Sequence, residues 1–147
     1  MSFKNDITLT PDISTCYRPG LRGVKTSDKK YFQCRNTSNI EGSVDIDSCL
    51  ASKYPNENRW DYVIGYDDQN YFIEIHPAST SNISEIIAKK NWLMQWLRNQ
   101  RSPLLQRSYS FHWIATGKVN IRKGSPQMNR LSSSGIKGPK KLCKCSF

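Results

Sequence analysis

The sequence predicts a single α/β domain: a small mixed β-sheet that includes a hairpin, one long amphipathic helix packed on it, and a basic C-terminal tail. Residues 59–77 read as two alternating strands joined by a tight turn, and residues 81–100 carry apolar side chains at helical spacing. A chain of 147 residues suits one domain with its own core. We place that domain over residues 1–123 and the tail over residues 124–147.

The segment before the hairpin carries weaker signals. Residues 1–30 contain several prolines and glycines and predict irregular structure with one or two short elements. A strand is expected at 30–35 and a loop at 36–42. Asp47 or Ser48 is then placed to cap a short helix that ends ahead of Pro55.

The long helix has clear start and stop signals. Asn82 stands three residues before Glu85, the spacing at which a cap side chain and a carboxylate satisfy each other's backbone donors. Trp92 and Trp96 are one turn apart and are expected to stack on its flank. The helix should end before Pro103, because the residue before a proline avoids helical geometry. A strand at 108–115 and a possible further strand at 118–122 follow.

The hairpin places two acidic side chains opposite each other. If Asp67-Asp68 form the turn and Tyr66 pairs with Gln69, Asp61 lies opposite Glu74, at a Cβ separation of about 5 Å. His76 shares the face of Glu74, because side chains alternate along a strand. Two facing carboxylates repel, so a positive charge is expected between them.

Several groups can supply that positive charge. Arg59 stands at the strand entrance, and Lys89 or Lys90 can reach back from the following helix. A divalent cation, Mg²⁺ or Mn²⁺, would suit Asp61 and Glu74 as carboxylate ligands. A cation held there polarises a phosphoryl oxygen and activates a bound water, which is the chemistry of phosphodiester hydrolysis.

Net charge points to a polyanionic partner. Residues 1–100 hold 12 Lys and Arg against 12 Asp and Glu, while residues 101–147 hold 10 Lys and Arg and no acid. Such a block can bind phosphates and release their counterions, although it can also be a solvated tail. The residues expected to bind nucleic acid are Lys118, Arg122, Lys123, Arg130, Lys137, Lys140, Lys141 and Lys144. DNA is favoured over RNA, and a homodimer or larger protein complex is left open.

The order of these features resembles the PD-(D/E)XK nuclease superfamily over roughly residues 45–115. An aspartate opens a strand, a hairpin leads to Glu-x-basic on the next strand, and an amphipathic helix and another strand follow. The resemblance implies a restriction-endonuclease-like core. His76 then occupies the position usually held by lysine, which in some branches comes from the neighbouring helix. The implied catalytic residues are Asp61, Glu74, His76, Lys89 and Lys90.

Three functions are consistent with the sequence. The first is a metal-dependent nuclease with Asp61 and Glu74 as metal ligands. The second is an inactive nucleic-acid-binding or regulatory protein on the same scaffold. The third is a metal-independent ribonuclease that uses His76 and His112 as base and acid, provided that both project into one cleft. Sensitivity to a chelator separates the first from the third, and binding without cleavage supports the second.

Cysteine usage and hydropathy suggest a location. The five cysteines are an odd number without regular spacing, so most are expected to be free thiols. Cys143 and Cys145 could supply two metal ligands, but a second pair is missing. No run of 18 apolar residues and no secretory signal is visible, so no membrane partner is expected and a cytoplasmic location is predicted.

Overall fold

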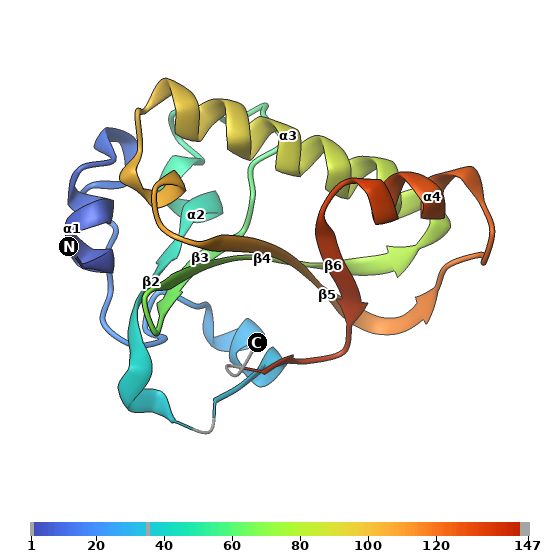
Figure 1. The fold of residues 1–147 in the computed structure, drawn as a ribbon, viewed down its shortest axis with the longest axis horizontal. Coiled ribbons are helices and arrows are strands. Elements are labelled where there is room, and N and C mark those ends of the chain that lie inside the picture. The colour runs from blue at the N-terminus through green and yellow to red at the C-terminus, as the bar shows by residue number, and fades with distance from the viewer. Residues whose placement is uncertain (1, 35, 145–147) are drawn as a thin grey trace.

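The structure, a computed structural model, describes residues 2–34 and 36–144. Within these ranges the chain forms one α/β domain built on a five-stranded mixed sheet of order β2-β3-β4-β5-β6 (Figure 1). Strand β3 pairs antiparallel with both β2 and β4, while β5 pairs parallel with both β4 and β6. The strands are β2 (Ile40–Asp45), β3 (Tyr62–Tyr66), β4 (Gln69–Ser79), β5 (Tyr109–Asn120) and β6 (Ile136–Lys140). The predicted single domain with a mixed sheet is confirmed.

Helices cover one face of this sheet (Figure 1). They are α1 (Phe3–Thr8), α2 (Ile46–Leu50), α3 (Ile83–Asn99) and α4 (Pro126–Ser133). The main core lies between them and the sheet, where Trp60, Phe72 and Trp113 are fully buried. Short 3-10 turns connect the elements: η1 (Pro11–Ile13), η3 (Thr37–Asn39), η4 (Thr80–Asn82) and η5 (Pro103–Leu105).

The opposite face carries a smaller layer. It contains the 3-10 helix η2 (Thr26–Tyr31) and a short parallel pair formed by β1 (Phe32–Gln33) and β7 (Cys143–Lys144). A second apolar cluster, with Tyr62, Ile73 and Ile114, fills the space beneath. Among the described residues, no helix is both long enough and apolar enough to cross a membrane.

The hairpin has the predicted register. Tyr66 pairs with Gln69, and the ladder continues to Tyr62 opposite Ile73. Asp67 and Asp68 have φ values of 48° and 62°, as a two-residue turn with left-handed central residues requires. Aspartate, like asparagine, adopts this conformation more often than most residues other than glycine.

Helix α3 matches the prediction in extent, but its start differs. The capping box joins Ser79 to Asn82 before η4, so the predicted pairing of Asn82 with Glu85 was wrong by one turn. The 3-10 turn in front of α3 supplies the earlier cap. Trp92 and Trp96 stack as predicted, with ring centroids 5.8 Å apart.

Long-range pairing overrides several local predictions. The segment expected to be a loop at 36–42 contributes to edge strand β2, and Asp45, rather than Asp47 or Ser48, caps α2 by accepting from the Ser48 backbone N–H. The two strands expected at 108–115 and 118–122 are one strand, β5.

The sequence predicts a basic tail outside the domain over residues 124–147, but residues 126–133 and 136–140 are part of the fold. They form α4 and β6, and β6 closes the sheet beside β5. Local composition favours a polar tail, but Leu131 and Ile136 are buried in the core and hold this segment in place.

The expectation of mostly free thiols is also wrong. Cys16 and Cys49 form a disulfide between the N-terminal segment and α2, and Cys34 is disulfide-bonded as well. Cys143 is a buried free thiol. The predicted alternative of metal ligation by Cys143 and Cys145 falls partly outside the described residues.

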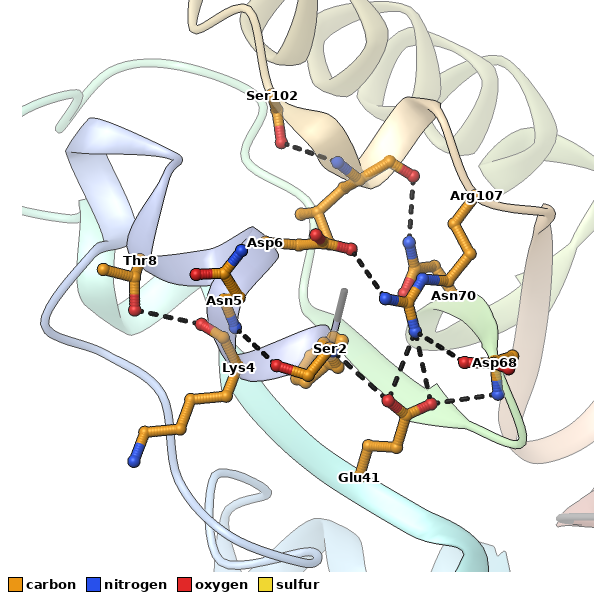
Figure 2. Close-up of polar contacts among 12 residues, drawn as sticks. Ser2, Lys4, Asn5, Asp6, Thr8, Glu41, Asp68, Asn70, Ser102 and Arg107 are labelled. Atoms are coloured by element: carbon orange, nitrogen blue, oxygen red, sulfur yellow. Dashed lines mark hydrogen bonds and ion pairs between the residues drawn. The ribbon is translucent and has the colours of Figure 1, made fainter.

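An ion-pair network fastens α1 to the hairpin turn. The Arg107 guanidinium forms ion pairs with Asp6, Glu41 and Asp68, at N···O distances of 3.2, 3.2 and 3.3 Å. Figure 2 shows the three carboxylates around it. Asp6 is 1% exposed, so this network is partly desolvated and holds elements that are distant in sequence. Glu41 also accepts from the Phe3 backbone N–H, which ties α1 to β2.

Candidate active site

Asp61 and Glu74 meet where the β3–β4 ladder ends. The Asp61 backbone N–H donates to Glu74 Oε1 at 3.0 Å, and the Ile75 backbone N–H donates to Asp61 Oδ2 at 2.9 Å. The two carboxylates thus accept from backbone N–H groups that lie just beyond Tyr62 and Ile73, the last pair of the β3–β4 ladder. The predicted juxtaposition of these two acids is present in the structure.

Lys89 provides the positive charge expected beside the acids. Its Nζ lies 2.6 Å from Glu74 Oε2, with the Glu74 side chain 0% and the Lys89 side chain 16% exposed. Helix α3 packs on the face of β4 that carries Glu74, and Lys89 points back into that interface. A charge-assisted bond of this length in a desolvated position is a strong one.

The other two candidate cations lie elsewhere. Arg59 pairs with Asp47 at 3.0 Å and donates to the Tyr54 carbonyl. Lys90 donates to the Ser134 carbonyl and lies over the Phe111 ring, 4.8 Å from its centroid. The structure therefore does not bring Lys90 to the acidic pair, because consecutive helical residues point about 100° apart.

His76 completes the cluster toward the surface. Its Nδ1 lies 3.7 Å from Glu74 Oε2, and its Nε2 lies 3.0 Å from Glu85 Oε2. Glu85 stands in the first turn of α3, one turn before Lys89. The sequence predicts a capping role for Glu85, although its i, i+4 spacing to Lys89 places the two on one helix face.

His112 lies on the other face of the sheet. It pairs with Ile73 in the parallel β4–β5 ladder, whereas Glu74 and His76 alternate to the helix-covered face. Burial lowers the pKa of His112 to about 4, with Lys140 and Lys137 adding to the effect. The condition for a His76–His112 ribonuclease, one shared cleft, is not met.

Burial controls the charge of the acidic pair. Desolvation raises the pKa of Asp61 to about 6, although the Ile75 N–H and Lys89 oppose it. Desolvation, and next the Asp61 carboxylate, raise the pKa of Glu74 to about 8 against the effect of Lys89. Burial alone would lower the pKa of Lys89, but the carboxylates outweigh it and the net shift is upward. Perturbed groups of this kind are concentrated at functional sites.

The donor set suits a hard divalent cation in part. Asp61 and Glu74 offer carboxylate oxygens, and Mg²⁺ is commonly held by one or two carboxylates together with waters. Among residues 2–34 and 36–144, no group of three or more His, Cys, Asp or Glu side chains is arranged to hold a metal. A cation at this site would therefore take its other ligands from water and substrate.

The predicted nucleic-acid-binding residues divide between two regions. The Arg122 backbone donates to Thr80 Oγ1 and Arg130 donates to Ser84 Oγ, which places both near the start of α3. Lys137 and Lys140 pair with β5 near His112, on the far face. Lys118, Lys123 and Lys141 are exposed, and the Lys144 side chain lies outside the described part of the chain.

Comparison with known proteins adds no further assignment. No protein-family model, curated protein or solved structure matches this chain.

Proposed function

We propose that the protein is a divalent-metal-dependent nuclease that hydrolyses phosphodiester bonds in nucleic acid, DNA in preference to RNA. The proposal rests on the cluster of Asp61, Glu74 and Lys89 at the end of the hairpin. Its order along the chain, with an acid before β3, an acid on β4 and a lysine on α3, supports the resemblance to PD-(D/E)XK nucleases.

Each residue of the cluster has a role in this proposal. Asp61 and Glu74 would hold Mg²⁺ or Mn²⁺, which when bound polarises a phosphoryl oxygen and lowers the pKa of a coordinated water. Lys89 stabilises negative charge that develops on the phosphate during the reaction. The bond between His76 and Glu85 orients the imidazole so that its Nδ1 faces Glu74.

A cleavage assay tests the proposal. Single- and double-stranded DNA and RNA are assayed, and we expect DNA to be cut faster than RNA with Mg²⁺ or Mn²⁺ and to be left intact with EDTA. Glu74→Gln should lower the cleavage rate at least about 100-fold, because it removes one charged ligand of the metal. A 100-fold loss corresponds to an activation free energy about 2.7 kcal/mol higher, at 1.36 kcal/mol for each factor of ten. Glu57→Gln, at an exposed loop residue, removes the same charge away from the site and should leave the rate unchanged.

A specific observation also favours the second candidate, an inactive nucleic-acid-binding or regulatory protein. The Lys89 ammonium already compensates a fully buried Glu74, as a structural ion pair would. In that case the protein binds nucleic acid but cuts none with any metal. Glu74→Gln then lowers stability without changing binding.

A further inference from the structure

An open groove lies between α3 and α4. Its volume is about 500 Å³, within the range of ligand sites, and it is lined by Lys90, Asn91, Asn129 and Arg130 together with Ile87 and two serines. These lining residues, all in the described part of the chain, include no aspartate or glutamate. The groove is therefore electropositive and rich in hydrogen-bond donors.

The two cations of the groove are held in place. Lys90 Nζ is fixed by the Ser134 carbonyl at the end of α4 and by the face of Phe111. Arg130 donates one hydrogen bond to Ser84 Oγ at 3.0 Å and is exposed. A guanidinium carries five N–H donors, so Arg130 presents further donors to a ligand.

The groove adjoins the candidate active site along α3. Lys90 follows Lys89, which contacts Glu74, and Ser84 precedes Glu85, which contacts His76. The groove and the acidic cluster therefore border the same turns of α3, with Lys90 and Lys89 directed about 100° apart around the helix. Asn, Ser and Arg side chains are the usual partners of phosphate oxygens.

We propose that the α3–α4 groove binds the phosphodiester backbone of the nucleic acid and positions it beside Asp61 and Glu74. The choice of a nucleic acid over another polyanion rests on the proposed function. The groove also explains the role of Lys90, which the fold keeps away from the acidic pair.

A matched pair of double variants tests the groove. Arg130→Gln/Asn129→Asp changes the charge by two units within it, and Arg98→Gln/Asn99→Asp makes the same change at exposed positions near the other end of α3. Binding to labelled DNA single strands, DNA duplexes and RNA is measured by fluorescence anisotropy in EDTA over a salt series. Thermal unfolding verifies that both variants fold.

The groove variant should bind at least about eightfold more weakly near 0.1 M salt, since each lost phosphate contact removes about 0.9 from the slope of log affinity against log salt. The control variant should bind like the wild type. Equal binding by the two variants would overturn the groove while leaving metal-dependent cutting, if observed, intact.

Two further results separate the groove from the proposed activity. If nucleic-acid binding depends on Arg130 and Asn129 but no cleavage occurs, the groove is supported as a binding site and the proposed nuclease activity is contradicted. Capture of polyglutamate, with no binding to any nucleic acid, overturns the assignment of the ligand.

Discussion

Glu74 is the residue on which the candidate site depends. Its carboxylate is fully buried, accepts from the Asp61 backbone and from Lys89, and lies 3.7 Å from His76. A charge in such a position is costly unless it is paired, and removal of one partner of a buried pair typically costs about 3–5 kcal/mol. The same desolvation that makes Glu74 expensive also strengthens its attraction for any cation.

The raised pKa of Glu74 predicts how stability changes with pH. A carboxyl whose folded pKa of about 8 exceeds its unfolded value contributes stability that is fully present below the unfolded value and is lost as the pH rises through the folded pKa. Asp61, with a pKa of about 6, acts in the same direction at lower pH. Without metal, the wild type should therefore lose a few kcal/mol between about pH 5 and pH 9.

The measurement is thermal unfolding in EDTA across that range. Glu74→Gln keeps an oxygen acceptor but does not titrate, so its stability should fall less with pH than that of the wild type. Gln cannot form the ion pair with Lys89 that the wild type gains as Glu74 ionises, so the slopes of stability against pH are compared rather than the midpoints. Parallel slopes for the two proteins would contradict the prediction.

At the scale of elements, the N-terminal segment is held to the rest of the fold by covalent and ionic links. The Cys16–Cys49 disulfide joins this segment to α2 over a sequence separation of 33. Arg107 links α1 to β2 and the hairpin turn. These links hold α1 and α2 against edge strand β2, which pairs with β3 next to the candidate site.

Removing the disulfide should loosen this arrangement. Cys16→Ser/Cys49→Ser is expected to lower the free energy of unfolding by about 3 kcal/mol, because the unfolded chain regains the freedom of an open loop. Urea unfolding under non-reducing conditions measures the difference. A reductant should then destabilise the variant less than it destabilises the wild type. A urea midpoint of the variant equal to that of the wild type, under non-reducing conditions, would refute the expectation.

Elements set by local signals could be predicted from the sequence. The Asp67-Asp68 turn and strand alternation were enough to place Asp61 opposite Glu74, and apolar spacing was enough to find α3. The choice between Lys89 and Lys90 was not accessible, because it depends on how α3 rotates on the sheet. Strands β2 and β6 and the disulfide were missed, since each depends on partners far away in the chain.

At the scale of the whole molecule, the sheet separates two chemical environments. The acidic cluster and the α3–α4 groove lie on the helix-covered face, while His112, Lys137 and Lys140 lie together on the other. The Cys16–Cys49 bond weighs against the predicted cytoplasmic location, because disulfides persist in oxidising compartments and are rare in the cytosol.

This separation predicts that equal losses of charge will have unequal effects. Arg122→Gln/Lys123→Gln, near the start of α3, should weaken nucleic-acid binding and lower kcat/KM for cleavage by about tenfold or more, because contacts to the phosphate backbone are lost next to the site. Lys137→Gln/Lys140→Gln removes the same charge from the far face and should lower both quantities far less.

Both double variants change the long-range field of the protein equally, so a difference between them reports on where the strand lies. Cleavage rates and anisotropy titrations at one salt concentration are sufficient for the comparison, with thermal unfolding to verify the fold. A direct phosphate contact acts within a few ångströms, whereas the field of the net charge extends over about 10 Å at 0.1 M salt. Raising the salt concentration should therefore weaken the contribution of net charge to binding before it weakens the contribution of direct contacts. A larger loss from the Lys137 and Lys140 pair would place the nucleic acid on the face of His112 and remove the acidic cluster from its path.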